Sequence, residues 1–158
     1  MTEPSWEVPE RALSLTQPWA WLIVSLGDGW KDTENRKPGF SHKSFRGGFL
    51  VHAAKRCTAS DYDSARQWVG QHVGAAAIEA IPPLVDLPRG GIVGASRIAD
   101  IVAPGESGRR WHMPDQHGFV LDGRRELPFV PCVGHQGCFW RVPALVREQI
   151  RAAVRSGR

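Results

Sequence analysis

Short segments in which apolar and polar residues alternate, separated by glycines and prolines, recur along this chain. The clearest are RGGFLVHAA, residues 46–54, and GGIVGASRIADIVA, residues 90–103. Alternation with a period of two is typical of β-strands that place one face in a core. In the first segment the alternation puts Phe49 and Val51 on one face of the strand and His52 on the other. The two segments therefore predict a core built mainly from β-strands.

Helix signals are fewer than strand signals. The expected helices begin at Thr16–Pro18 and near Ser60, and a closing helix covers residues 143–156. The expected strands are residues 13–15, 33–36, 49–53, 92–101 and 139–142. The Asp122-Gly123 pair indicates a β-hairpin, and the prolines within residues 74–89 indicate a connector. Many short strands with few helices favour an α+β, mainly β fold, a small mixed β-barrel flanked by helices, over an alternating α/β sheet.

We expect one domain, residues 12–158, preceded by a flexible tail of residues 1–11 that is rich in proline and glutamate. A chain of 158 residues with 42% hydrophobic residues is long enough to bury a core without disulfides or metals. It contains no run of about 18 apolar residues, and its acidic N-terminus lacks the apolar stretch of a secretory signal. The three widely spaced cysteines do not form a disulfide framework. These features favour a cytoplasmic protein without membrane association.

The positive charge of the chain is concentrated in its last third. The net charge is +4, with equal numbers of acidic and basic residues in residues 1–104 and 9 Lys and Arg against 5 Asp and Glu in residues 105–158. Arg147, Arg151 and Arg155 recur every four residues within the expected closing helix. Such a stripe suits a phosphate backbone, although a solvated basic helix face is the commoner explanation. The charge therefore permits binding of nucleic acid without requiring it.

The segment GWKDTENR, residues 29–36, sets a lysine, a glutamate and an arginine directly after a glycine turn. Lys31 at a turn is a mobile point charge suited to a phosphate or a developing oxyanion. Glu34 and Arg36 are two apart in an expected strand, so they face the same way and can pair. From these residues alone, an ion pair that braces the sheet and a site for an anion both stay open.

Six motif blocks occur in order along the chain, over about residues 12–143. They are Gln17-Pro18-Trp19-Ala20, Gly29/Lys31/Glu34/Arg36, Arg46-Gly47, Val51-His52-Ala53, Gly91-Ile92-Val93-Gly94 and Phe139-Trp140. Together they resemble the ASCH (activating signal cointegrator homology) family of PUA-like folds. The resemblance implies a PUA-like barrel with a ligand cleft at Lys31. It also implies a partner such as RNA, another single-stranded nucleic acid, or a modified nucleoside or nucleotide.

The resemblance leaves two kinds of function open. One is a binding module that holds RNA or a nucleotide in the Lys31 cleft. The other is a hydrolase that acts without a metal or other cofactor in the same cleft, either a ribonuclease or an amidohydrolase on N4-acylated cytidine. In a ribonuclease Lys31 would stabilise negative charge, and Glu34 or His52 would act as the base. An amidohydrolase would need a nucleophile or an activated water beside Lys31. The amidohydrolases of the family have a threonine three residues after their lysine, where this chain has Glu34.

The remaining candidate ligand-binding residues lie on other blocks. They are Gln17, Trp19, Arg36, Arg46 and Ser96. We expect Lys31, Arg46 and Gln17 to line one concave pocket with Lys31 exposed at its mouth, so that replacing Lys31 would affect ligand binding and leave stability nearly intact. Trp19 is suited to stacking on a base, but a tryptophan on the apolar face of a helix more often belongs to the core.

The cluster Cys132-x-x-His135-x-x-Cys138 has metal-type residues at plausible spacing. Zinc sites usually contain two close pairs of ligands, and this is a single cluster beside two glycines. We therefore predict a loop without metal at this position.

Overall fold

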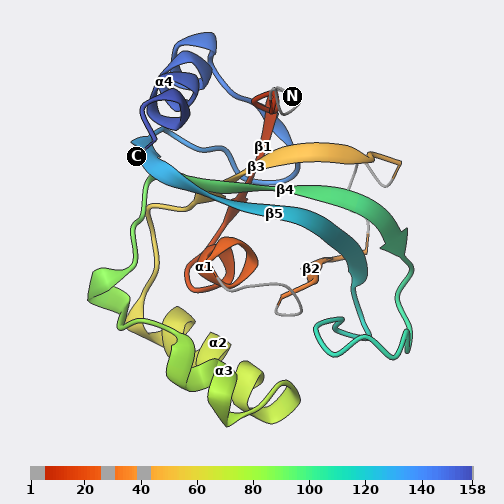
Figure 1. The fold of residues 1–158 in the computed structure, drawn as a ribbon. Coiled ribbons are helices and arrows are strands. Elements are labelled where there is room, and N and C mark those ends of the chain that lie inside the picture. Colours follow the sequence, from red (N-terminus) through yellow and green to blue (C-terminus); the bar gives the residue numbers. More distant parts are fainter. Residues whose placement is uncertain (1–5, 26–30, 39–43, 158) are drawn as a thin grey trace.

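The computed structural model of the protein describes residues 6–25, 31–38 and 44–157. These residues form an α+β fold with a six-stranded mixed sheet and four α-helices (Figure 1). The strands are β1 (Arg11–Leu15), β2 (Thr33–Arg36), β3 (Gly47–Ala53), β4 (Gly91–Val102), β5 (His117–Pro131) and β6 (Trp140–Arg141). The helices are α1 (Trp19–Val24), α2 (Ala59–His72), α3 (Ala75–Ala80) and α4 (Ala144–Arg155), with a short 3-10 turn at Leu84–Asp86.

The sheet has the strand order β2-β5-β4-β3-β1-β6. The β1–β3 pair is parallel and the other pairs are antiparallel. Among the described residues the sheet does not close into a barrel, because β2 and β6 remain at its edges. It nevertheless curls, since the Arg36 side chain on edge strand β2 donates a hydrogen bond to the Ser14 carbonyl on β1 at 3.2 Å. The α+β, mainly β class is confirmed, and the closed barrel is not.

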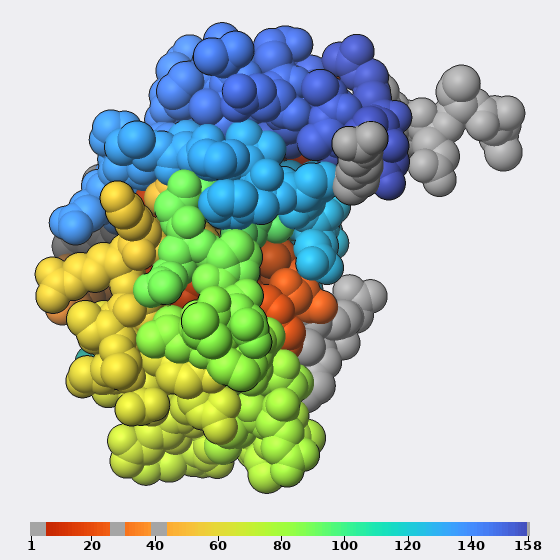
Figure 2. Space-filling view, turned by 90° about the vertical axis from the view of Figure 1, so that its left-hand side faces the viewer, coloured from red at the N-terminus to blue at the C-terminus, as the bar shows by residue number. Residues whose placement is uncertain are grey.

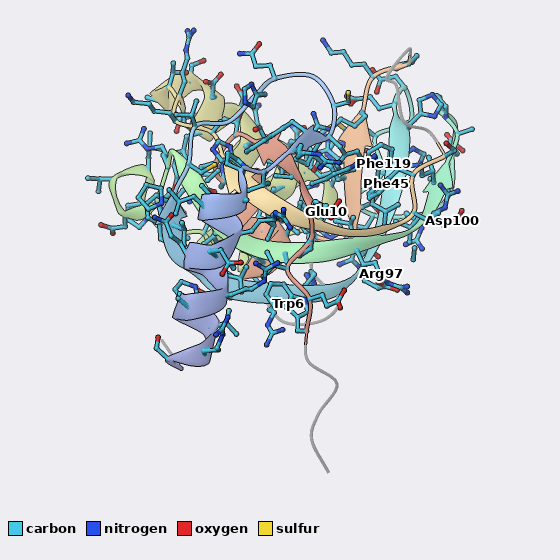
Figure 3. The ribbon with its side chains drawn as sticks, turned by 90° about the horizontal axis from the view of Figure 1, so that it is seen from above. Trp6, Glu10, Phe45, Arg97, Asp100 and Phe119 are labelled. Atoms are coloured by element: carbon cyan, nitrogen blue, oxygen red, sulfur yellow. The ribbon has the colours of Figure 1, made fainter. Side chains whose placement is uncertain are left out.

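The alternation in the strands separates two cores on opposite faces of the sheet. On β3, Phe49 and Val51 pack with α1, whereas Leu50 on the other face packs with Ile150 of α4. Trp6, labelled in Figure 3, packs against the α4 side of the sheet. The alternation predicted from the sequence for β3 is confirmed, and it fixes which side chains each helix covers.

The N-terminal boundary lies earlier than the sequence suggested. Val8 is buried in the core beside α4, and the backbone carbonyl of Glu10 accepts a hydrogen bond from the backbone N–H of Val142 at 2.9 Å. Residues 6–11 therefore pack against the domain instead of forming part of a tail. The apolar side chains of Trp6 and Val8, set between the prolines and glutamates, supply the burial that holds them there.

The predicted hairpin at Asp122-Gly123 is wrong. Strand β5 continues through both residues, and the chain reverses instead in the polar loop that joins β4 to β5 (Figure 1). Gly123 adopts φ +60°, and the β4–β5 register shifts beside it. The positive φ of this glycine would suit a hairpin turn, but here it occurs at an irregular position within a long paired strand. At this position Arg97 of β4 binds the Asp122 carboxylate at 2.8 Å.

Residues 74–89 connect α2 to β4, and they contain α3 and the 3-10 turn, which were not predicted from the sequence. The run AAAIEA consists of good helix formers, and Ala77 buries itself in a third apolar cluster between α1, α2 and α3. The prolines of this segment, Pro82, Pro83 and Pro88, all follow the end of α3 at Ala80. Helix α1 begins as expected next to Pro18 but ends at Val24, and Thr16 provides no side-chain cap. The glycines that follow in the sequence, Gly27 and Gly29, favour an end of this helix there, and both lie outside the described residues.

None of the helices in the described part of the chain has the length and apolar character needed to cross a lipid bilayer.

Candidate functional site

Lys31 lies directly before β2 and is almost completely buried. Its Nζ donates hydrogen bonds to the Thr33 carbonyl at 2.8 Å and to Glu34 Oε2 at 2.7 Å. It also lies 5.3 Å from the centre of the Trp19 ring on α1. The Lys31 side chain is only 1% exposed, so the prediction of an exposed lysine at the mouth of a pocket is wrong. The four-carbon stem lets the ammonium fold back onto its own strand, which the sequence pattern does not reveal.

Burial dominates the electrostatics of this lysine. Loss of hydration lowers the pKa of Lys31 below its ordinary value, and the adjacent Glu34 carboxylate opposes this effect. Glu34 also lies near a second cation, with Oε1 3.6 Å from Arg36 Nη2. The predicted pairing of Glu34 with Arg36 is therefore confirmed. In this arrangement Lys31 is buried against Glu34, and Glu34 in turn lies beside Arg36.

Arg36 is the member of this charged cluster that reaches a pocket. The pocket has a volume of about 380 Å³, and we call it the Arg36 pocket. It is lined by Asn35, Arg36, Lys37, Pro38, Gln116 and Gly137. Asn35 is held in place because its amide donates to the Trp111 carbonyl at 2.9 Å and its Oδ1 accepts from the Met113 N–H at 2.8 Å. The loop between β4 and β5 thus positions the end of β2.

The other predicted ligand-binding residues have partners elsewhere. Gln17 is buried, and its side chain donates to the Pro88 carbonyl at 2.8 Å. Arg46 pairs with Asp100 at 3.3 Å, and Figure 3 shows Asp100 at the end of β4 that lies away from α4. Ser96 is buried and donates to the Asp122 carbonyl at 3.1 Å. None of these residues lines the Arg36 pocket or the larger pocket described next.

A larger pocket of about 650 Å³ lies at the ends of β3, β4 and β5, and we call it the basic pocket. Its lining includes Lys55, Arg56 and Arg89, and none of the described residues that line it carries a carboxylate. The side chains of these three residues are exposed. On the face shown in Figure 2, the yellow segment after β3, the green segment before β4 and the blue segment after β5 lie side by side. Their positive charges therefore converge on one cavity.

Backbone hydrogen bonds hold the walls of the basic pocket together. The Gly90 N–H donates to the Ala53 carbonyl at 2.8 Å, and the Cys132 N–H donates to the Gly90 carbonyl at 3.1 Å. Gly90 adopts φ +79°, which a glycine tolerates without strain. After the wall residue Lys55, helix α2 begins with a capping box between Thr58 and Asp61. These local features turn the chain sharply after β3 and fix where its basic residues lie.

The floor of the basic pocket contains Ser14 of β1 and His52 of β3. His52 Nδ1 lies 3.0 Å from Ser14 Oγ, and its Nε2 lies 2.8 Å from the Cys132 carbonyl. Burial lowers the pKa of His52 below its ordinary value, so the ring is neutral near pH 7. Trp140 Nε1 lies 3.1 Å from the same Ser14 hydroxyl. His52 was predicted as a possible base, and both of its ring nitrogens have protein partners.

The Cys-x-x-His-x-x-Cys segment does not assemble a metal site within the part of the chain that the structure describes. Cys132 is buried and its thiol donates to the Val133 carbonyl, whereas His135 is exposed at the rim of the basic pocket.

Comparison with known proteins does not assign the chain to a family. No family model matches it, and no curated protein matches it.

The sequence pointed to Arg36 in one pocket and to His52 in the other, and it missed the remaining polar residues of the basic pocket. The missed residues are Ser14, Lys55, Arg56 and Arg89. A usable signal was present, because Lys55 and Arg56 follow β3 directly and Arg89 precedes β4. The end of one strand and the start of its antiparallel neighbour lie at the same edge of a sheet. Basic residues in these two places are therefore brought together.

Proposed function

We propose that this chain is an ASCH-type, PUA-like domain that binds RNA or a related nucleotide, with ligand phosphates held in the basic pocket. The observation that carries this proposal is a cavity of about 650 Å³ that is lined by three cationic side chains and by no carboxylate among the described residues. Clustered Lys and Arg side chains are the groups that neutralise phosphates, and Arg in particular forms paired hydrogen bonds with them.

The two pockets supply more contacts together than either supplies alone. Gln136 lines the basic pocket, and the next residue, Gly137, lines the Arg36 pocket. The pockets therefore adjoin across one loop, and Arg36 and Lys37 extend the positive surface beyond it. A single strand is flexible enough to pass over such a loop and place successive phosphates on both sides. This arrangement favours an oligonucleotide over a mononucleotide as the ligand.

The hydrolases implied by the family resemblance fit this geometry less well. Both chemistries require Lys31 in contact with the substrate, and its ammonium is buried against Glu34 and Thr33. We therefore propose binding as the function of this cluster, in which Glu34 orients Arg36 at the pocket. We also propose that the protein acts in the cytoplasm, where its three unpaired cysteines stay reduced.

The test is binding of a fluorescein-labelled ten-nucleotide single-stranded RNA, followed by anisotropy at several salt concentrations. The Arg56→Ala/Arg89→Ala variant is expected to bind at least tenfold more weakly. The negative slope of log affinity against log salt concentration should become shallower by about 1.4, because each of the two lost phosphate contacts on a single strand contributes about 0.7. The matched control is Arg151→Ala on α4, a partly exposed arginine that pairs with Glu148 and lines neither pocket. An unchanged affinity for the double variant, or an equal loss for Arg151→Ala, would overturn the proposed site.

A further inference from the structure

The hydrogen bonds on the floor of the basic pocket have only one possible direction. A carbonyl only accepts, so His52 Nε2 carries the hydrogen that binds the Cys132 carbonyl. In the neutral ring Nδ1 is then an acceptor, and the Ser14 hydroxyl must donate to it. The indole N–H of Trp140 only donates, so it binds a lone pair of Ser14 Oγ. The serine proton therefore points at the imidazole, which is the starting arrangement for removing that proton.

Pocket access distinguishes this pair from a second one with the same contacts. In the loop between β4 and β5, Ser107 Oγ lies 2.7 Å from His112 Nδ1, and His112 Nε2 lies 2.7 Å from the Gln116 carbonyl. Neither member of that pair lines the basic pocket or the Arg36 pocket. Ser14 and His52 both line the basic pocket, and Ser14 is partly exposed there. A ligand in the pocket can thus reach the Ser14 hydroxyl.

The loop that follows β5 fixes the position of the imidazole. A Cβ added at Gly134 would collide with the His52 ring, so this glycine lets the loop backbone lie directly against it. On another side the ring meets Trp140 edge-to-face, with a distance of 5.4 Å between ring centres. Fixed in this way, His52 presents Nδ1 to Ser14 without a rearrangement. A base held ready is what general-base catalysis requires.

We propose that Ser14 is a nucleophile and His52 its general base, and that the basic pocket hydrolyses carboxylic esters whose acyl or alcohol part carries an anionic group. Ser14 Oγ forms a bond to the ester carbonyl carbon while its proton passes to His52 Nδ1. The carbon–oxygen bond to the alcohol then breaks, and the departing oxygen takes the proton from His52. Water attacks the acyl-serine in the second half, gives its proton to His52, and releases the carboxylic acid as the proton returns to Ser14.

The charges of the pocket determine the substrate class. Lys55, Arg56 and Arg89 give the cavity a positive potential that favours an anionic ester and the oxyanion formed from its carbonyl. This inference rests on the proposed function only in requiring that the basic pocket admit an anionic ligand. It does not require that ligand to be RNA.

The first test is covalent labelling. Diisopropyl fluorophosphate should add one phosphoryl group to the full chain, detected by intact mass, and peptide mapping should locate the adduct on Ser14. Ser14→Ala should abolish the adduct, and the matched variant Ser107→Ala should keep it. Ser14 also holds Trp140 and His52, so the mapped position in the wild-type protein decides the question if the alanine variant does not fold. An adduct elsewhere, or no adduct, would overturn the inference.

The second test is turnover of 4-acetoxybenzoate against its neutral methyl ester, followed by release of the phenol. We expect the anionic substrate to be hydrolysed faster than in buffer and in preference to the neutral one. His52→Gln should lower that rate by about 100-fold or more. Arg56→Ala/Arg89→Ala should remove the preference for the anion, and Ser107→Ala should change nothing. Hydrolysis no faster than in buffer would refute the activity, and RNA affinity measured on the same samples would separately decide the proposed function.

Discussion

Replacing Glu34 with alanine is expected to destabilise the protein strongly. Glu34 Oε2 binds Lys31 Nζ at 2.7 Å, and the Lys31 side chain is 1% exposed. After truncation the ammonium keeps the Thr33 carbonyl, the Trp19 ring and the weaker attraction of Asp32. Removing one partner of a buried pair costs about 3–5 kcal/mol of unfolding free energy. In a chain of this size each kcal/mol shifts the melting temperature by about 2–4 °C, so a decrease of about 6–20 °C follows.

Urea denaturation, monitored by tryptophan fluorescence, measures this loss. The control is Lys31→Met/Glu34→Gln, which removes both charges and is expected to lose less stability than Glu34→Ala. The loss of unfolding free energy in Glu34→Ala should become smaller as the pH rises toward the ordinary lysine pKa of 10.5. Over this pH range Lys31 is protonated more in the unfolded chain than in the folded one, so raising the pH favours the folded state. A neutral Lys31 amine also needs no counter-charge. If Glu34→Ala unfolds within about 0.5 kcal/mol of wild type, the buried pair does not stabilise the fold and the reasoning fails.

Three further outcomes follow from the contacts described above. Gly134→Ala should lower the unfolding free energy by about 1–3 kcal/mol, because the new methyl group overlaps the His52 ring, and an unchanged melting temperature would contradict the close packing. Because burial lowers the pKa of His52, the unfolded chain binds more protons, so stability should fall as the pH drops below about 6.5. The same pH profile in His52→Gln would show that this residue is not responsible. Tyr62→Phe should cost about 0.5–1.5 kcal/mol in urea titrations, since its hydroxyl donates to the Pro82 carbonyl at 2.6 Å, and no loss would mean that water replaces the bond.

Alternation of side chains made most of the sheet predictable. Every predicted strand appears, and the faces of β3 carry Phe49 and Leu50 as expected. The hairpin prediction failed because Asp122-Gly123 suits both a turn and an irregular position within a strand, and only pairing with β4 distinguishes them. Local turn preference is a short-range signal, and here the long β4–β5 pairing overrides it.

The candidate site was less predictable than the fold. The pairing of Glu34 with Arg36 follows from strand parity, but parity does not reveal that Lys31 folds back under Trp19. Because Lys31 is buried and paired, we now expect its replacement to lower the stability of the protein, instead of leaving it intact. The basic pocket draws Lys55 and Arg89 from segments that neighbour each other only after β3 and β4 have paired. Such a cluster depends on strand order, which spacing along the chain does not determine.

The hydrogen bond from Arg36 to the Ser14 carbonyl joins a residue of the Arg36 pocket to a residue of the basic pocket. Arg36 lines one pocket, and the hydroxyl of Ser14 lies in the other. A ligand that displaced the guanidinium in the first pocket would break its hydrogen bond to the backbone of the serine in the second. Any resulting change in affinity is reciprocal, because linkage requires each ligand to alter the other's binding free energy by the same amount. If ligands bind both pockets, as proposed above, the curl of the sheet links their sites through the Arg36 side chain, in addition to the loop that the two pockets share.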